Sequence, residues 1–176
     1  NYLFHRQGSD YFSGEIGEVL IYNRALSDSE CKTVEDYLFK KWIGAELPSD
    51  VIRWPEQPAS YDPHIAETDP SLSPQPPVMA GLDFRLDAEE VLLSSADPNK
   101  VYQWVDRTAT ARTFWQPDQT MQPAYVRNAT YLGRPVVRFD GSNDRFNDRI
   151  SIHAGGSGGN EITVFAAVNP TRTSWN

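Results

Sequence analysis

The alternation of hydrophobic and polar residues divides the chain into three parts. Residues 1–44 hold one strongly apolar strand pattern and one helical pattern, and residues 45–80 are interrupted by prolines. Residues 81–176 alternate short apolar runs with turn-forming residues. Because a period of two indicates a strand and a period near 3.6 indicates a helix, the pattern predicts two structured segments joined by an extended one.

The run "GEIGEVLIY" predicts a buried β-strand near the start of the chain. By the strand period, Ile16, Leu20 and Tyr22 share one face, and Val19 and Ile21 share the other. A half-exposed strand would keep one face polar, so apolar residues on both faces indicate a strand that is covered on both sides.

A helix is predicted directly after this strand, from Asp28 to about Trp42. Ser27 and Glu30 have the spacing of a capping box, which satisfies free N–H groups at a helix start. Gly44 is well placed to end the helix. The helix carries an apolar stripe formed by Cys31, Val34, Leu38 and Trp42. On this stripe the one cysteine is expected to act as a buried small hydrophobe.

Residues 45–80 are rich in proline and in acidic residues. They hold eight of the thirteen prolines, and six acidic residues against one basic residue. Proline at this density excludes helix and sheet interiors and favours extended, polyproline-like backbone. The segment also contains Val51, Ile52, Trp54 and Tyr61, which a free tether has little use for. We therefore expect an extended acidic linker, with contact to a protein surface as the alternative to a tether.

The third part predicts an all-β arrangement. "GLDFRLDA" places Leu82, Phe84 and Leu86 on one face, and "KVYQWVDRT" places Tyr102 and Trp104 on one face. Short strands separated by Gly, Asn and Pro are typical of a β-sandwich.

Two further strand patterns lie near the end of the chain. Val137 and Phe139 are expected to enter a hairpin whose turn begins at Asp140-Gly141, and Ile150 and Ile152 to leave it. "EITVFAAVNP" is apolar on both faces and predicts a second fully buried strand, which Pro170 stops.

The net charge and the composition argue against several kinds of binding and structure. Sixteen basic residues against 24 acidic ones give a net charge of −8, which disfavours binding to nucleic acid or to an anionic membrane surface. The sequence has no apolar run of membrane-spanning length, so no membrane span is expected. A single cysteine excludes a disulfide within the chain.

Six stretches resemble one known family. "FSGEIGEVLIYNRALSDSE" with "VEDYLFKKW" is similar to the last strand and closing helix of the laminin G-like jelly-roll domains in the concanavalin A-like lectin/glucanase superfamily. "GLDFRLDA", "VYQWVDRT", "GRPVVRFDGSNDRF" and "ITVFAAVNP" are similar to its opening half. The resemblance covers most of residues 11–44 and 81–170. It implies an all-β antiparallel jelly-roll sandwich with one short amphipathic helix, and an extracellular or cell-surface location.

The order of the parts departs from the family, because the closing part precedes the opening part. Three explanations stay open: a piece of a tandem array, a circularly permuted and shortened domain, or two parts that complete sandwiches in neighbouring subunits. Residues 1–44 are accordingly expected to be the C-terminal part of one sandwich, 45–80 a linker, and 81–176 the N-terminal part of a sandwich.

One strand and one helix are too little to fold alone, so residues 1–44 must dock on the β-rich part of this chain or of a neighbour. Docking in a neighbour is head-to-tail and generates rings or filaments. The residues expected to make this assembly contact are Ile16, Val19, Leu20, Ile21, Tyr22, Leu38, Trp42, Ile162, Val164 and Phe165.

Paired carboxylates for glycoside hydrolysis are not predicted. Enzymes of the superfamily place two acids on one face of a strand, as the chemistry requires. Glu15 and Glu18 are three positions apart, so on a regular strand they point to opposite faces. Glu89 and Glu90 are adjacent and expected in a turn. A non-catalytic protein is therefore expected.

The stretch "DGSNDRFND" is a weak candidate for calcium, which many laminin G-like domains bind. Asp140, Asn143, Asp144 and Asp148 offer the oxygen ligands that calcium prefers. The same residue types are favoured in hairpin turns, and the full calcium-loop motif is missing. His5, His64 and His153 are widely separated and show no metal-ligand spacing. No other cofactor is expected.

Two surface features could involve glycans. Trp115, next to Phe114, could stack on a sugar ring, although core packing is the favoured interpretation. Asn128 begins the glycosylation sequon "NAT".

These observations favour a non-catalytic extracellular structural or adhesive module. We expect a repeating subunit of a filament or surface protein, assembled by head-to-tail domain completion, with copies of itself or adjacent domains as partners. The alternative is a carbohydrate-binding module of a larger secreted enzyme or adhesin.

Overall fold

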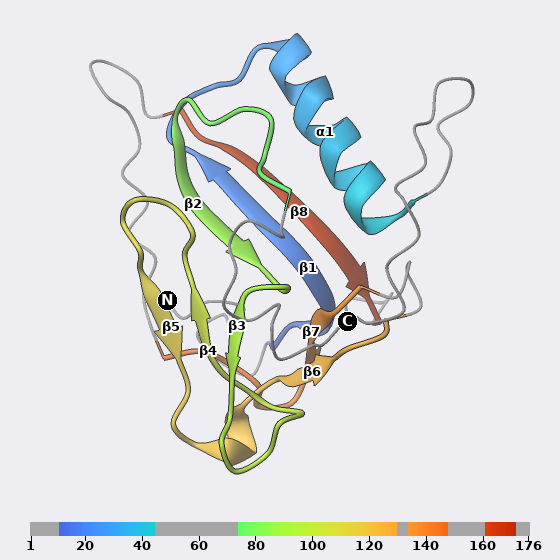
Figure 1. Cartoon of the computed structure of the whole chain (residues 1–176), viewed down its shortest axis with the longest axis vertical. Helices are drawn as coiled ribbons and strands as arrows, with labels where there is room; N and C mark the ends of the chain where they lie inside the picture. Colours follow the sequence, from blue (N-terminus) through green and yellow to red (C-terminus); the bar gives the residue numbers. More distant parts are fainter. Residues whose placement is uncertain (1–10, 45–73, 130–133, 148–160, 172–176) are drawn as a thin grey trace.

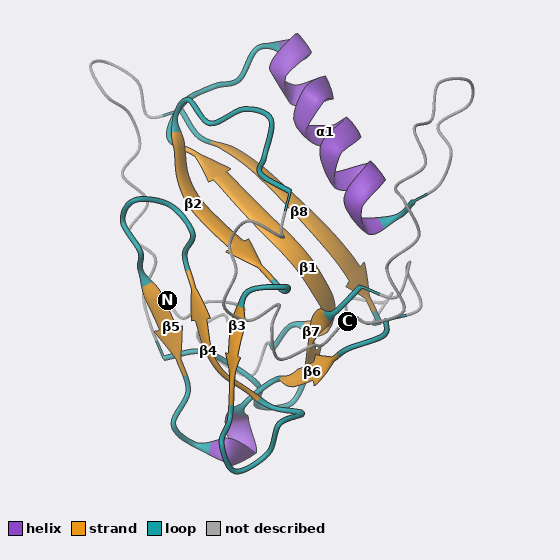
Figure 2. Cartoon of the chain, in the orientation of Figure 1, coloured by secondary structure: helices purple, strands orange, loops and turns teal. Residues whose placement is uncertain are grey.

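The structure, a computed structural model, describes residues 11–44, 74–129, 134–147 and 161–171. Figure 1 shows strands from both ends of the chain side by side in one sheet. The predominant structure is antiparallel β-sheet with one α-helix among the described residues (Figure 2). This arrangement is consistent with a β-sandwich.

The larger sheet is built around β1 (Ser13–Tyr22). One edge of β1 pairs with β8 (Thr163–Pro170) along nearly its whole length. The other edge is shared: its first half pairs with β7 (Val136–Asp140) and its second half with β2 (Leu82–Asp87). β6 (Ala124–Val126) then pairs with β7. The N-terminal strand is therefore the centre of the sheet formed by the C-terminal part.

The smaller sheet has the order β3 (Val91–Leu93), β4 (Val101–Val105) and β5 (Thr113–Trp115). A short 3-10 helix, η1 (Gln119–Met121), follows β5. The two sheets share one hydrophobic core. Aromatic rings link them: Phe84 of β2 meets Phe114 of β5 edge-on at 5.4 Å between ring centroids. Burial of such rings is the main stabilising contribution expected in a domain of this size.

The helix α1 (Asp28–Trp42) covers the outer face of the larger sheet. Its start is the predicted capping box: the Ser27 side chain accepts from the Glu30 amide, and Glu30 accepts from the Ser27 amide. Gly44 lies just past its end with φ of 59°, a conformation that favours glycine. The sequence-based prediction of this helix is confirmed at both ends. No helix among the described residues is long and apolar enough to span a membrane.

The described end of the Pro-rich segment lies against the domain. The Pro74 carbonyl accepts from the hydroxyl of Tyr37 and from the guanidinium of Arg85. The Val78 carbonyl accepts from the hydroxyl of Tyr22. Residues 74–80 thus contact the domain surface, while residues 45–73 lie outside the described residues.

Two strand predictions need correction. Val137 does not start the expected hairpin, because it pairs with β1 on one side and with β6 on the other. Ile150 and Ile152, the expected return strand, lie outside the described residues. The second correction concerns β8, which was expected to be buried on both faces. It alternates between half-buried and exposed residues, because only one of its edges and one of its faces are covered by described elements.

Candidate functional site

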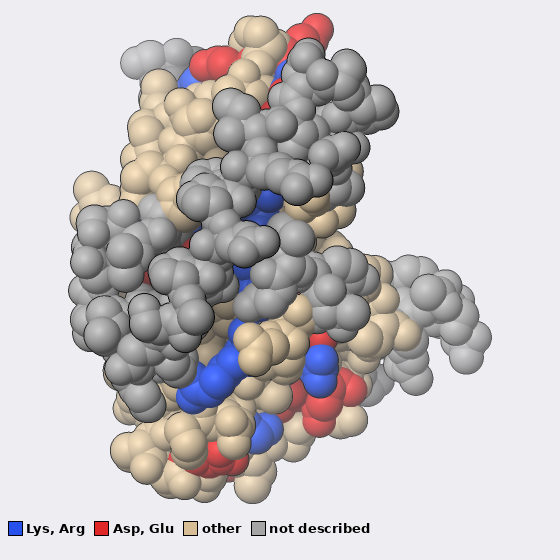
Figure 3. Space-filling model, turned by 45° about the vertical axis from the view of Figure 1, so that its right-hand side comes forward, with Lys and Arg blue, Asp and Glu red and all other residues tan. Residues whose placement is uncertain are grey.

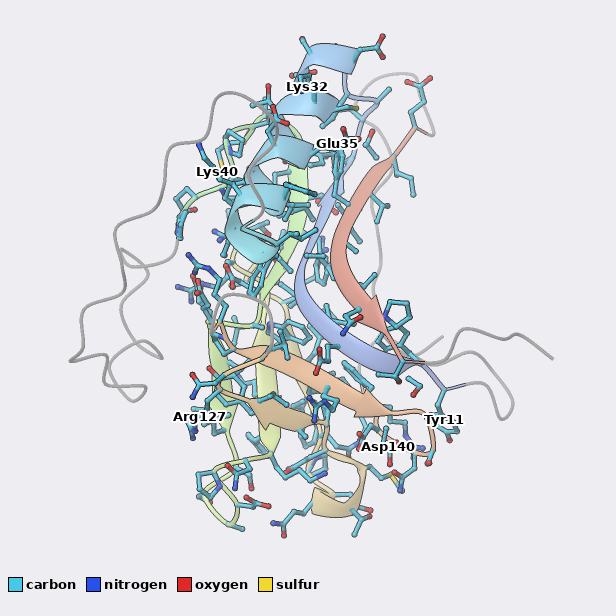
Figure 4. All side chains as sticks on the ribbon, turned by 90° about the vertical axis from the view of Figure 1, so that its right-hand side faces the viewer. Tyr11, Lys32, Glu35, Lys40, Arg127 and Asp140 are labelled. Atoms are coloured by element: carbon cyan, nitrogen blue, oxygen red, sulfur yellow. The ribbon has the colours of Figure 1, made fainter. Side chains whose placement is uncertain are left out.

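The most distinctive surface of the protein is the outer edge of β8. Among the described residues, β8 pairs with β1 alone, so its second edge has no described strand beside it. Figure 4 shows β8 beside β1, with α1 on one side of the pair and the outer edge of β8 on the other. Unpaired backbone N–H and C=O groups on a long edge are a ready template for another strand.

The backbone of β8 shows which residues offer those groups. The Thr171 amide donates to the Ser13 carbonyl, so the backbone of residue 171 points inward, to β1. Backbone direction alternates along a strand, and therefore Asn169, Ala167, Phe165 and Thr163 also point inward. The amides and carbonyls of Val164, Ala166 and Val168 point outward, to the open edge.

The same three residues form an uncovered apolar strip. Val164 is paired with Ile21, and Ala166 with Val19, so the strip lies on the face that carries the core of the larger sheet. Val164 is 51% exposed and Val168 is 49% exposed, whereas Val19 and Ile21 are buried. The smaller sheet therefore leaves the β8 end of this face uncovered.

A groove runs beside β8 on the opposite, helix-covered face. It has a volume of about 580 Å³ and lies between the C-terminal half of α1 and the strand. Most of its lining is apolar: Leu38, Phe39, Trp42, Ile43, Phe165 and Ala167. Glu35 also lines it and lies on the side of α1 nearer β8 in Figure 4. An apolar groove beside an open strand edge can receive the side chains of an added strand.

Glu15 lines the same groove and is held by its neighbours. It accepts from Arg138 Nε at 3.0 Å and from Asn169 Nδ2 at 3.1 Å. Burial alone would raise the pKa of Glu15, but the hydrogen bonds from Arg138 and Asn169 lower it below its ordinary value. This carboxylate therefore stays ionised and fixed at the β1–β8 junction.

A buried ion cluster holds α1 on the sheet. It consists of Glu18, Lys41, Arg85 and Asp87, and we call it the ion cluster. Lys41 Nζ lies 3.1 Å from Glu18 Oε2 and also bonds Asp87. Arg85 bonds both acids, through Nε to Glu18 at 2.9 Å and through Nη2 to Asp87 at 2.7 Å. The two positive and two negative charges of the ion cluster cancel, and the hydrogen bonds among these side chains offset the free-energy cost of burying them.

Neighbouring side chains complete the ion cluster. Glu18 also accepts from Trp42 Nε1 at 3.0 Å and from the Tyr37 hydroxyl at 3.1 Å. One carboxylate therefore binds two side chains from the C-terminal part of α1. Burial and the nearby charge of Asp87 raise the pKa of Glu18. Burial would also raise the pKa of Asp87, but Lys41 and Arg85 lower it. The cluster fixes the helical wall of the groove.

The expectation that Glu15 and Glu18 point to opposite faces is wrong. The pairing of β1 with β8 shifts by one residue between Ile16 and Glu18, as in a β-bulge at Gly17. Glu15 faces Asn169 and Glu18 faces Ala167, two residues of β8 that share a face. Both acids therefore lie on the helix side of the sheet, but the Glu18 side chain is 0% exposed and is enclosed by the ion cluster.

Glu89 and Glu90 turn to different partners. Glu89 pairs with Arg134 and lies 3.5 Å from Lys41, at the margin of the ion cluster. Glu90 pairs with Arg107. Each carboxylate is thus neutralised separately, and the two do not form a shared pair.

Most residues expected to make an assembly contact lie in the core of this same chain. Ile16, Val19, Leu20, Ile21, Tyr22, Leu38 and Trp42 are buried there. Ile162 and Val164 are exposed, and Phe165 is partly buried beside Tyr22. Of the expected surface, only its β8 part is accessible.

The turn after β7 uses its carboxylates to bind backbone. Asp140 Oδ1 accepts from the amides of Ser142, Asn143 and Asp144, and Asp144 Oδ2 accepts from the Asp140 amide at 2.9 Å. In the described part of the chain, no group of three His, Cys, Asp or Glu side chains could hold a metal ion. Asp148 and the three histidines lie outside that part. Calcium binding stays an untested prediction.

Asp144 gives the turn a pH dependence. Burial raises its pKa from 3.8 to about 6. Because the folded pKa lies above the unfolded one, the folded protein binds more protons between these values, and the free energy of unfolding falls as pH rises from about 4 to about 6. Asp144→Asn keeps an acceptor for the Asp140 amide, but it does not titrate and so removes this fall in the free energy of unfolding. Urea unfolding of both proteins at pH 4, 5, 6 and 7 should show the variant gaining stability relative to the parent as pH rises; a constant difference would contradict this.

Trp115 is not a core residue, contrary to the favoured interpretation. It is 43% exposed, while its neighbour Phe114 is buried. Trp115 and Leu92 are both paired with Gln103, so the three side chains form a row on the outer face of the smaller sheet. Asn128 is exposed, so the sequon residue is accessible. Cys31 is partly buried on α1.

Acidic and basic side chains are interspersed on the described surface of the face in Figure 3.

Comparison with family models, with curated proteins and with solved structures found no match for this chain.

Proposed function

We propose that this protein is a non-catalytic structural or adhesive module with a jelly-roll fold, and that it acts outside the cell or at the cell surface. Its edge strand β8 receives a β-strand from a partner, which is another copy or an adjacent domain of the same filament or surface protein. The resemblance to laminin G-like domains supports the location and the fold. The open edge of β8 is the observation that carries the proposed activity.

Three features of β8 support strand addition. The segment Ile162–Pro170 carries no charged side chain, although natural edge strands are commonly protected by charges. Its two faces offer apolar contacts to alternate residues of an added strand: Val164 and Val168 on one face, and the groove on the other. The outward backbone groups of residues 164, 166 and 168 supply the hydrogen bonds.

Selection from a phage-displayed library of random nine-residue peptides tests this proposal. The full chain should select peptides with alternating apolar residues, and their binding should be lost in Ala166→Pro, which removes an outward amide. The control is Leu92→Lys, because Leu92 is similarly exposed but lies on the smaller sheet. Selected peptides that bind Ala166→Pro as well as the parent would refute strand addition at β8, and so would the recovery of no binding peptide.

A second candidate function is carbohydrate binding at Trp115. The exposed indole, in register with Gln103 and Leu92, provides an apolar platform with an adjacent amide, a combination that can bind a pyranose ring. Glycan-array binding by the full chain that Trp115→Ala abolishes, and that Met79→Ala leaves unchanged, would support this function. Binding that survives Trp115→Ala, or the absence of any binding, would reject it.

A further inference from the structure

The larger sheet has one long edge without a described partner. The outward edge of β2 is covered by residues 106–112: the Arg85 carbonyl accepts from the Arg107 amide, and the Arg85 amide donates to Asp106. The outward Asp83 carbonyl accepts from Thr108 and Arg112. The β6 edge is bridged by residues 99–101. Among the described strands of this sheet, β8 is therefore the edge that another copy can extend.

This limits how two copies can join their sheets. A head-to-tail chain of sheets needs two different open edges on each copy, whereas a two-fold pair needs only one edge that matches itself. Residues of β8 meet themselves in such a pair, with the two strands antiparallel. Its hydrogen bonds must come from the outward residues 164, 166 and 168.

We propose that β8 pairs with β8 of a second copy, antiparallel and centred on Ala166, so that the two larger sheets become one continuous sheet. This inference rests on the proposed function of β8 as a strand-accepting edge. In this register Ala166 faces Ala166 of the second copy, and Val164 faces its Val168. The three outward pairs supply about six backbone hydrogen bonds between the copies.

The side chains fit this register on both faces. On the core-side face, Val164, Ala166 and Val168 of the two copies form a continuous apolar strip. On the helix side, the large Phe165 faces the small Ala167. The nearest charged residue in sequence, Glu161, faces Thr171 and not a second carboxylate. No pair in the strand places like charges opposite each other.

The two-fold axis also joins the grooves. Because the axis of a continuous antiparallel pair is perpendicular to the sheet, both α1 helices lie on the same face. The two grooves then merge into one trough above the β8 pair, bordered by Phe39 and Ile43 of each copy. Ile43 is 49% exposed in the single chain. A specific interface requires roughly 1,000 Å² of total buried surface, and the strand pair and the helix pair contribute to it together.

Charge reversal tests both the contact and its register. Sedimentation equilibrium of the full chain should show a dimer. Val164→Lys/Val168→Lys should weaken association at least about 100-fold, because each lysine then faces a lysine. Val164→Glu/Val168→Glu should be monomeric for the same reason. An equimolar mixture of the two variants should recover the dimer, which also shows that both remain folded. Leu92→Lys is the matched control and should dimerise like the parent.

Disulfide trapping gives the register independently. In the Cys31→Ser background, Ala166→Cys should form a disulfide-linked dimer on mild oxidation, whereas Leu92→Cys should not. A monomeric parent chain, or a dimer that persists in Val164→Lys/Val168→Lys, would overturn the two-fold pair. In either case, β8-dependent peptide binding would leave the proposed strand-accepting function standing, and its loss would remove both.

Discussion

Lys41→Met is expected to lower the free energy of unfolding by about 3–5 kcal/mol, because it leaves two buried carboxylates with one cation. The Lys41 side chain is 0% exposed and bonds both Glu18 and Asp87. Methionine preserves the helix propensity and most of the volume, so the effect reports the missing charge. Chemical denaturation at pH 7, followed by tryptophan fluorescence, measures the loss.

The neighbouring lysine is the matched control. Lys40 lies on the side of α1 away from β8 in Figure 4, and Lys40→Met should change stability by less than about 0.5 kcal/mol. The double variant Lys41→Met/Asp87→Asn should lose less than the sum of its single variants, since it restores charge balance. Equal effects of Lys40→Met and Lys41→Met would show that the ion cluster does not hold the helix.

Gly17→Ala is expected to cost about 1–3 kcal/mol by overpacking the bulge beneath the helix. A Cβ at this position would lie 2.5 Å from Cε3 of Trp42, closer than carbon atoms approach. The indole must then move, although its Nε1 is bonded to Glu18 and its ring lines the groove. Thermal and urea unfolding measure the cost, and a reduced yield of selected β8-binding peptides would show that the groove changed.

A double-mutant cycle separates this clash from a backbone effect. Trp42→Leu removes the ring that the new methyl group would strike. Gly17→Ala should therefore be much less costly in the Trp42→Leu background than in the parent. The same cost in both backgrounds would place the effect of Gly17→Ala in the backbone and contradict the packing argument.

Local patterns predicted the N-terminal elements well. The existence of the strand at β1 and of the helix at α1 follows from period-two and helical spacing, and Ser27 with Glu30 marks the helix start. These elements are determined by residues close to one another in the sequence, so their residue pattern alone is enough to predict them. The predicted faces of β1 are wrong in one respect: the bulge at Gly17 places Ile16 on the face of Val19 and Ile21, not with Leu20 and Tyr22. In the structure, strands of the C-terminal part pair with both edges of β1, and its apolar side chains are buried in the core of this same chain.

The exposure of β8 could not be predicted from its sequence. An apolar strand shows what it could bury, but whether strands lie beside it depends on residues distant in the chain. β1 and β8 have similar patterns, yet β1 has strands on both edges and β8 on one among the described residues. The bulge at Gly17 could not be predicted for a related reason. A one-residue shift in register is a property of the paired strands β1 and β8, and the sequence of one strand does not show it.

The ion cluster was also missed, although the sequence carries a sign of it. Arg85 and Asp87 alternate with the apolar Phe84 and Leu86 in β2, and Lys41 adjoins Trp42 on the apolar stripe of the helix. Charged residues that alternate with core residues are usually a solvated face. The positions of α1 and of residues 74–75 over that face turn them into a buried cluster.

Amide hydrogen exchange along β8 is the most direct test of its role as an open edge. In dilute solution of the full chain, the inward amides of Phe165 and Ala167 should exchange slowly, and the outward amides of Val164, Ala166 and Val168 quickly. Raising the protein concentration, or adding a selected peptide, should slow the three outward amides. Outward amides that are already protected at the lowest concentration, where the chain sediments as a monomer, would show that the edge is closed within the chain and would contradict strand addition at β8.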